Sequence, residues 1–153
     1  MASLLPIISD ILPMIIPAAT QVIRARDLEP SHPTVEGPII QRPAVVDKSD
    51  KMCASVVFMA RPHQASPIRH NSEQDAIIYA VSGSGILVVK EGFKGQLHRH
   101  ELSPGDFAFV PAWTEHQLCN ETDSDVAFVI FQGGARPVGV ELSDWAGQVI
   151  SQR

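Results

Sequence analysis

The sequence has few cysteines and no arrangement of them that would define a disulfide-rich or zinc-binding protein. Its 153 residues include Cys53 and Cys119 only, which form no disulfide framework and no C-x-x-C pair. We therefore expect a protein of a reducing compartment, in the cytoplasm. The length is that of one globular domain with a single core.

Long apolar runs and basic clusters are also missing. The apolar stretch from residue 4 to residue 16 is interrupted by Pro6, Asp10 and Pro13, and is too short to span a bilayer. It has no basic residue before Arg24, unlike a secretory signal, so we expect it to belong to the mature fold. The net charge is −5 without a Lys/Arg cluster, which argues against nucleic-acid or membrane partners and favours a small organic substrate.

What the sequence does contain is a series of short β-branched and aromatic runs between Asp47 and Phe131, separated by turn residues. This pattern is typical of an all-β sandwich or barrel. The turns include Ser82–Gly85 and Ser103–Asp106, which contain glycine or proline. The predicted strands are Ala54–Met59, Ala76–Val81, Gly85–Val89, Leu97–Leu102, Asp106–Val110 and Val126–Phe131.

Three segments follow from these patterns: an N-terminal arm (1–46), a barrel (47–135) and a C-terminal tail (136–153). In the arm, residues 21–26 and 37–41 are predicted edge strands. In the tail, Ser143 is a predicted N-cap of a short helix over residues 143–150. The Leu and Ile side chains of residues 4–16 are too apolar to be left in water, so we expect the arm to pack on the barrel or on the partner subunit of a homodimer.

The most specific motif lies between Gly105 and Asn120. It resembles the second motif of the cupin family, G-x5-P-x-G-x2-H-x3-N, with matches at Gly105, Pro111, His116 and Asn120 and with Trp113 where the family usually has glycine. The resemblance implies a cupin double-stranded β-helix (jelly-roll barrel), with His116 in its interior as a metal ligand or proton carrier.

The first cupin motif, G-x5-H-x-H-x3,4-E-x6-G, is mostly absent. Counting back from Gly83 with a spacer of three residues, the first histidine falls on His70, the second on Ser72 and the glutamate on Ala76. The resemblance therefore implies a weakened site, in which His70 and His116 and, through strand alternation, Gln74 would hold a divalent metal such as Fe, Mn, Zn or Ni.

Strand alternation also predicts which side chains enter the barrel. If His70 points inward, Gln74 does too, whereas Glu73 and Asp75 point outward unless the preceding loop is irregular. Phe107 and Phe109 are predicted to join the core. The residues expected to contact substrate are Gln74, Ser72, Trp113, Ile78, Tyr79 and Phe109.

The remaining histidines have simpler interpretations. His98 and His100 form an H-x-H pair on one strand face, which we interpret as a solvated face or a subunit contact rather than a metal site. His63 is expected at the surface. The two candidate site histidines also have non-functional interpretations. His116 could be a structural histidine bonded to a backbone carbonyl, and His70 could be a residue at the rim of the barrel.

The resemblance implies a small-molecule cupin enzyme of a secondary-metabolite or aromatic pathway. Because Ala76 replaces the anionic ligand, non-redox chemistry (isomerase, cyclase, dehydratase or decarboxylase) with His116 and His70 as catalytic residues is favoured. Two alternatives stay open. One is a metal-dependent dioxygenase whose site is completed by Gln74, Glu73 or Asp75, and the other is a non-catalytic module that binds a small molecule.

Overall fold

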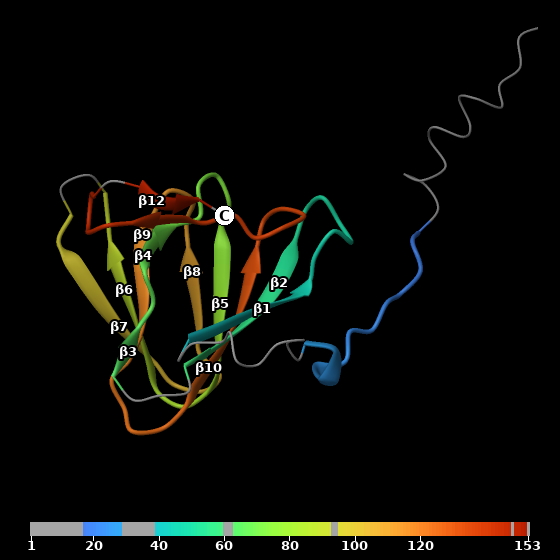
Figure 1. The fold of residues 1–153 in the computed structure, drawn as a ribbon, viewed down its shortest axis with the longest axis horizontal. Helices are drawn as coiled ribbons and strands as arrows, with labels where there is room; N and C mark the ends of the chain where they lie inside the picture. Colours follow the sequence, from blue (N-terminus) through green and yellow to red (C-terminus); the bar gives the residue numbers. More distant parts are fainter. Residues whose placement is uncertain (1–16, 29–38, 60–62, 93–94, 148, 153) are drawn as a thin grey trace, which may run out of the picture.

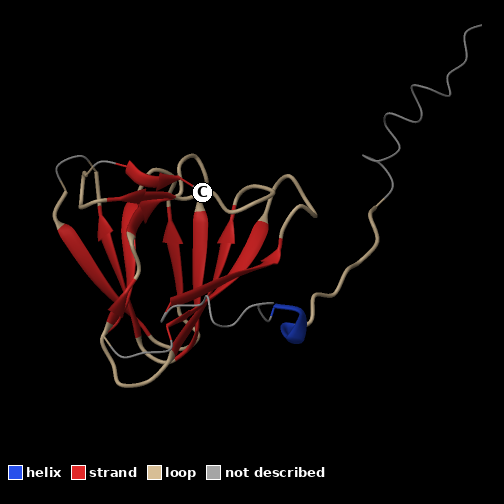
Figure 2. Ribbon diagram, viewed as in Figure 1, coloured by secondary structure: helices blue, strands red, loops and turns tan. Residues whose placement is uncertain are grey.

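The computed structural model describes residues 17–28, 39–59, 63–92, 95–147 and 149–152. Two antiparallel β-sheets face each other around one core (Figures 1 and 2). The elements are η1 (Ala25–Leu28), β1 (Ile39–Val45), β2 (Cys53–Met59), β3 (Gln64–Ala65), β4 (Ile68–His70), β5 (Ala76–Ser82), β6 (Gly85–Lys90), β7 (Leu97–Leu102), β8 (Phe107–Val110), β9 (Glu115–Asn120), β10 (Val126–Gln132), β11 (Val140–Leu142) and β12 (Val149–Gln152).

The strand order is that of a jelly roll, because most neighbours in each sheet are distant in sequence. The first sheet, here called sheet A, runs β1-β2-β10-β5-β8, and the second, sheet B, runs β12-β11-β4-β9-β6-β7 with β3 also paired to β9. The predicted fold class is thereby confirmed, and each of the six predicted strands is present within one residue of its expected ends. The sheets also take in β1 from the arm and β11 and β12 from the tail.

The core lies between the inner faces of the two sheets. Alternation along each strand buries every second residue, as in β5, where Ala76, Ile78 and Ala80 are buried while Ile77 and Val81 are exposed. The buried cluster consists of Val57, Ala76, Ile78, Ala80, Leu87, Val89, Leu102, Val110, Leu118, Val126 and Phe128.

The predicted C-terminal helix over residues 143–150 is wrong. Strands β11 and β12 pair antiparallel, with Glu141 opposite Ser151. The turn between them is closed by Gly147 N, which donates to Asp144 O over 2.7 Å, and Ala146 has a φ of 57°. A residue in the left-handed conformation terminates a helix. The N-cap pattern at Ser143 therefore starts a single turn, and Ala146 prevents it from continuing as a helix.

The predicted strand over residues 21–26 is also wrong, since residues 17–24 have no regular structure and 25–28 form the short 3₁₀ helix η1. Residues 17–24 are exposed and lead away from the barrel, whereas η1 lies next to β1 (Figure 1). The predicted strand at 37–41 corresponds to β1 from Ile39 onward, and residues 1–16, 37 and 38 lie outside the described residues. No helix among the described residues is long and apolar enough to cross a membrane.

Gly85 lies against the most buried aromatic ring of the described residues, that of Phe128. A Cβ at residue 85 would lie 2.1 Å from Cζ of Phe128, which is 0% exposed. We therefore expect Gly85→Ala to lower the free energy of unfolding by about 3 kcal/mol, the upper range for overpacking. Urea unfolding measures this change. Gly133→Ala is the matched control, since its Cβ would have only Asp75 O within 4 Å, at 3.8 Å; an equal loss in both variants would contradict the prediction.

Candidate functional site

His116 lies on β9 with its side chain inside the barrel and only 5% exposed. Its Nδ1 is 2.9 Å from Thr114 O. A carbonyl oxygen can only accept, so Nδ1 carries the proton and Nε2 carries the lone pair. Burial lowers the pKa of His116 to about 4; the Thr114 hydrogen bond opposes this shift, and Arg69 and His70 add to it. His116 is therefore a neutral imidazole with a proton-accepting nitrogen at physiological pH.

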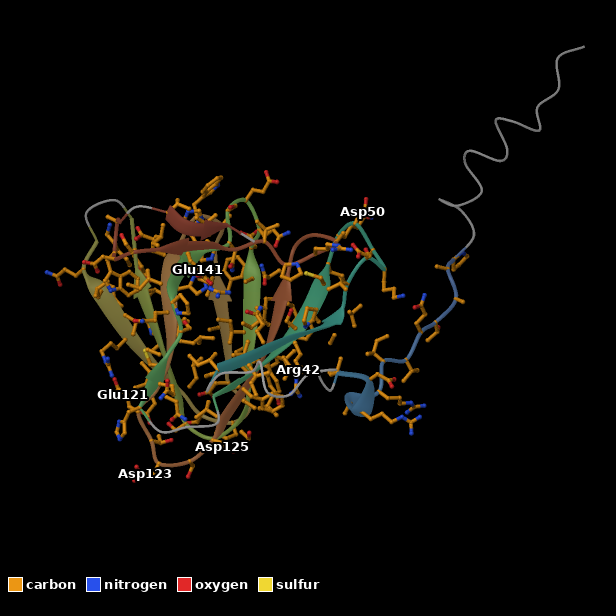
Figure 3. The ribbon with its side chains drawn as sticks, viewed as in Figure 1. Arg42, Asp50, Glu121, Asp123, Asp125 and Glu141 are labelled. Carbon is orange, nitrogen blue, oxygen red and sulfur yellow. The ribbon has the colours of Figure 1, made fainter. Side chains whose placement is uncertain are left out.

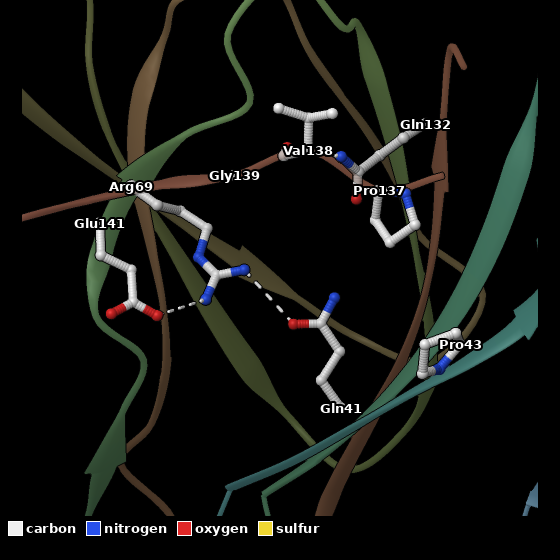
Figure 4. A pocket seen from close by; sticks show the side chains of 8 residues that line it. All are labelled: Gln41, Pro43, Arg69, Gln132, Pro137, Val138, Gly139 and Glu141. Carbon is white, nitrogen blue, oxygen red and sulfur yellow. Dashed lines mark hydrogen bonds and ion pairs between the residues drawn. The ribbon is translucent and has the colours of Figure 1, made fainter. Parts of the chain in front are cut away.

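Arg69 on β4 is paired directly with His116 across the sheet. The side chains of such a pair lie on the same face, with Cβ atoms about 5 Å apart. On its other side Arg69 is paired with Glu141 of β11, and the Arg69 Nη2 to Glu141 Oε1 distance is 3.5 Å. Arg69 Nη1 also donates to Gln41 Oε1 over 3.3 Å (Figure 4). The guanidinium is thus held between two strands that are far apart in the sequence.

Two cavities meet at Arg69. The inner one, of about 50 Å³, lies between the sheets and is lined by His116, Asn71 and Ile78 among others. The outer one, of about 150 Å³, is lined by Pro137, Val138 and Glu141 among others (Figure 4). Both are also lined by Gln41, Arg69 and Gln132. A small molecule in the outer cavity would therefore contact the same guanidinium that faces His116.

The structure places Arg69 and Asn71, not His70 and Ser72, in the barrel interior beside His116. The reason is a turn: Gln74 N donates to Asn71 O, and Ser72 has a φ of 50°. This turn breaks the alternation that was expected to place His70, Ser72 and Gln74 on one face. The same cupin motif with a spacer of four residues, which the motif also allows, would have placed its two histidine positions on Arg69 and Asn71.

His70 lies at the rim of the barrel. Its ring packs against Trp113 with 5.4 Å between ring centroids, and its Nδ1 accepts a hydrogen bond from Ser72 N over 3.1 Å. Trp113 is 65% exposed and has a φ of 64°. This left-handed backbone explains why the family usually has glycine at the position. Neither His70 nor Trp113 lines the two cavities at Arg69.

Gln74 is buried, as predicted, but it is held in a structural network. Its Oε1 accepts hydrogen bonds from Gln132 Nε2 and Val138 N, and its Nε2 donates to Arg136 O. The network ties β10 to the segment that leads into β11. It thereby fixes one wall of the outer cavity, which Gln132 and Val138 line.

We expect Gln74→Ala to lower the free energy of unfolding by about 3 kcal/mol. The substitution removes the acceptor of Gln132 Nε2 and Val138 N and the donor to Arg136 O, and the loss of each of these three hydrogen bonds costs roughly 1 kcal/mol. Chemical denaturation measures the loss, with Gln64→Ala, on the short strand β3, as the control. A loss no larger than that of the control would contradict the role of the network.

Three of the other residues predicted to contact substrate, Ile78, Tyr79 and Phe109, lie on different faces of sheet A. Ile78 lines the inner cavity, whereas Tyr79 pairs with Phe107, and Phe109 pairs with Ile77, on the outer face. Phe107 and Phe109 are 69% and 64% exposed. The prediction that these two phenylalanines belong to the core is wrong, because Ala108 and Val110 take the inward positions of β8.

The carboxylates of the dioxygenase alternative point away from His116. Glu73 and Asp75 are exposed, as alternation predicts, and Asp75 Oδ1 accepts a hydrogen bond from Ala112 N.

The predictions that Cys53 and Cys119 are buried and that His63, His98 and His100 are exposed are confirmed. Asn120 is 0% exposed and accepts from Thr122 to shape the turn before β10.

Figure 3 shows that Glu121, Asp123 and Asp125 lie at the end of the barrel opposite to Glu141. The site at Arg69 is therefore remote from this acidic end. Among the residues around the two cavities, the sequence patterns pointed to His116, Ile78 and Ile130. The four-residue spacer of the first cupin motif would have pointed to Arg69 and Asn71, whereas Gln41, Gln132 and Glu141 carry no motif.

Comparison with known proteins places this site in a family. The cupin domain family (Cupin_2) matches residues 56–131, which include β4, β9 and the central strands of both sheets. The chain belongs to the cupin family. No curated protein matches this cupin at a significant level.

Solved structures share the cupin fold at low sequence identity. The protein TT1209 from Thermus thermophilus is 22% identical with a TM-score of 0.58, over 75% of this cupin and 98% of that chain. A mutant of Bacillus subtilis oxalate decarboxylase is 17% identical with a TM-score of 0.65, over 75% of this cupin and 31% of that chain. A cupin sugar phosphate isomerase from Silicibacter pomeroyi is 21% identical with a TM-score of 0.52, over 68% of this cupin and 66% of that chain.

The residues of this cupin do not fit the metal that an intact pair of cupin motifs implies. With the four-residue spacer, the ligand positions of the two motifs hold Arg69, Asn71, Ala76 and His116, so three of the four lack a histidine or carboxylate. A guanidinium cannot be deprotonated to ligate a cation, and its charge repels one. Within the described parts of the chain, no group of three or more His, Cys, Asp or Glu side chains could hold a metal ion.

Proposed function

We propose that this cupin is a non-redox enzyme that moves a proton next to the carbonyl group of a small organic acid. His116 Nε2 accepts the proton, and the Arg69 guanidinium stabilises the negative oxygen that forms. The observation that carries the proposal is the direct cross-strand pairing of Arg69 with His116, both of which line one cavity.

The chemistry needs a base and a cation on the same side of the substrate. Removal of the proton leaves an electron pair that moves onto the carbonyl oxygen to give an enolate. Arg69 presents N–H donors in a rigid fork that suits a carboxylate or an enolate oxygen. Because His116 is neutral and holds its proton on Nδ1, its Nε2 is available as the acceptor.

The cavities limit the size of the substrate. Their volumes of about 150 and 50 Å³ suit a molecule of a few carbon atoms rather than a large aromatic ring. Structural neighbours named for oxalate oxidase with glycolate, oxalate decarboxylase and sugar phosphate isomerase support an oxygen-rich small molecule. We therefore expect a keto or hydroxy acid.

The test is solvent deuterium incorporation. Pyruvate and 2-oxobutyrate, incubated with the protein in deuterated buffer and followed by proton NMR, are expected to lose their C3 proton signals faster than without protein. The expected pattern is loss of this activity in His116→Gln and retention in His98→Gln, a control at an exposed histidine. Exchange at the uncatalysed rate, or equal rates in wild type and His116→Gln, would overturn the proposal.

One observation favours a second candidate, a non-catalytic binding module. The pKa of His116, about 4, lies well below the operating pH, and a base is most effective when the two match. In a binding module, His116 would only accept a hydrogen bond from a ligand hydroxyl. Calorimetric binding of glycolate together with no deuterium exchange in the keto acids would favour this function.

A further inference from the structure

The outer face of sheet A carries two apolar rows that cross four strands. The register places one row along Phe109, Ile77, Phe131 and Ala54, and the next along Phe107, Tyr79, Val129 and Val56. The rings of Tyr79 and Phe107 pack against each other, with 4.7 Å between their centroids. None of the residues in the two rows is charged.

The exposed side chains of this face are large. Phe107 and Phe109 are 69% and 64% exposed, and Phe58, Ile77, Val81 and Phe131 are between 38% and 44% exposed. With roughly 200 Å² for a fully exposed large apolar side chain, these six expose about 600 Å² of apolar surface. Patches of that size on a soluble protein mark interaction sites.

The area matches what a stable dimer needs. A standard interface buries about 800 Å² per partner, of which roughly 60–65% is apolar, or about 500 Å². A membrane surface would require several basic residues around the apolar side chains; the two rows contain none, and their continuation on β1 adds Val45 and one basic residue, Arg42. Phe107 and Phe109 border a hollow of about 510 Å³ that extends toward β7 and contains Glu91, Glu101 and Asp106. The two apolar rows run the other way, over β5, β10 and β2, where a second sheet can pack against them.

We propose that the outer face of sheet A is a docking surface for the same face of a second copy of this chain. A two-fold interface requires one patch that is complementary to itself. Two parallel rows of similar apolar residues meet that requirement, because a two-fold rotation places the rows of one copy against the rows of the other. The two sheets would pack as the layers of a β-sandwich, about 10 Å apart.

Light scattering on the full chain tests the proposal. Wild type is expected at twice the chain mass, and Phe107→Glu and Phe109→Glu are each expected to shift toward the monomer mass at the same concentration. Leu97→Glu is the matched control, since Leu97 is an apolar side chain, 47% exposed, on β7 of sheet B. A monomeric wild type, or dimers in both phenylalanine variants, would overturn the proposal.

Circular dichroism shows whether each variant is folded, and hydroxyl-radical labelling of wild type gives a measurement that needs no variant. Labelling of Phe107 and Phe109 relative to Leu97 is expected to fall several-fold as the protein concentration rises; an unchanged ratio would contradict the docking surface. Removal of residues 1–18 tests whether the N-terminal arm or the outer face of sheet A forms the dimer contact. A dimer that survives the deletion supports the sheet interface, and a monomer would assign the contact to the arm and overturn the proposal.

Discussion

Replacing Arg69 with methionine is expected to weaken binding of glycolate or pyruvate by about 100-fold, because a charged hydrogen bond to a carboxylate contributes roughly 1.5–3 kcal/mol. The same change is expected to lower the free energy of unfolding by about 3 kcal/mol. Glu141, whose side chain is only 13% exposed, would then keep its charge without the guanidinium 3.5 Å away. Calorimetric titration measures the first effect and urea unfolding the second.

A double variant separates these two effects. In Arg69→Met with Glu141→Gln, the negative charge of Glu141 is removed together with the guanidinium, so most of the stability is expected to return, whereas the affinity for the acid is not. Arg99→Met is the control for loss of a positive charge, since Arg99 pairs with Glu121 on the surface. Recovery of affinity in the double variant would show that the guanidinium is not the group that binds the acid.

Protonation of His116 is expected to make the protein less stable as the pH falls. Burial lowers the pKa of His116 in the folded state to about 4, from its ordinary value of 6.5. Between these two values the unfolded chain binds the proton and the folded chain does not, so the stability that His116 contributes is complete above pH 6.5 and is lost as the pH falls toward 4. The full loss is about 3 kcal/mol at 1.36 kcal/mol per pKa unit.

Urea unfolding of wild type and His116→Gln at a series of pH values tests this prediction. The variant lacks the titrating ring, so the stability difference between the two proteins is expected to shift by about 3 kcal/mol over that pH range, in favour of the variant at low pH. The other five histidines are present in both proteins and cancel in the comparison. A constant difference between wild type and variant at all pH values would contradict a buried neutral His116.

The second cupin motif predicted its part of the structure well because it describes one local unit. Gly105 and Pro111 bound β8, and His116 follows on β9 with its side chain inside. The turn before β8, the strand β8 and the following strand β9 all lie within sixteen consecutive residues. Alternation along β5 was equally reliable, since Ile78 lies in the core.

The partners of His116 were harder to predict because they depend on contacts between distant segments. One left-handed residue, Ser72, decides whether Arg69 or His70 enters the barrel, and alternation cannot reveal such a turn. Gln41 and Glu141 reach Arg69 only through the pairing of strands far apart in the chain. On β8, the pattern Phe-Ala-Phe-Val predicted two buried phenylalanines, because hydrophobicity alone does not distinguish a core face from a face that meets another surface.

The position of β11 has a consequence for synthesis on the ribosome. Because β10 pairs with both β2 and β5, and β11 brings Glu141 to Arg69, neither sheet can be assembled from the first hundred residues. Such long-range pairing delays folding, so the emerging chain exposes its apolar strands until residue 142 has left the exit tunnel. The emerging chain therefore carries exposed apolar residues and unpaired strand edges, the features that favour aggregation, until β10 and β11 can join the sheets.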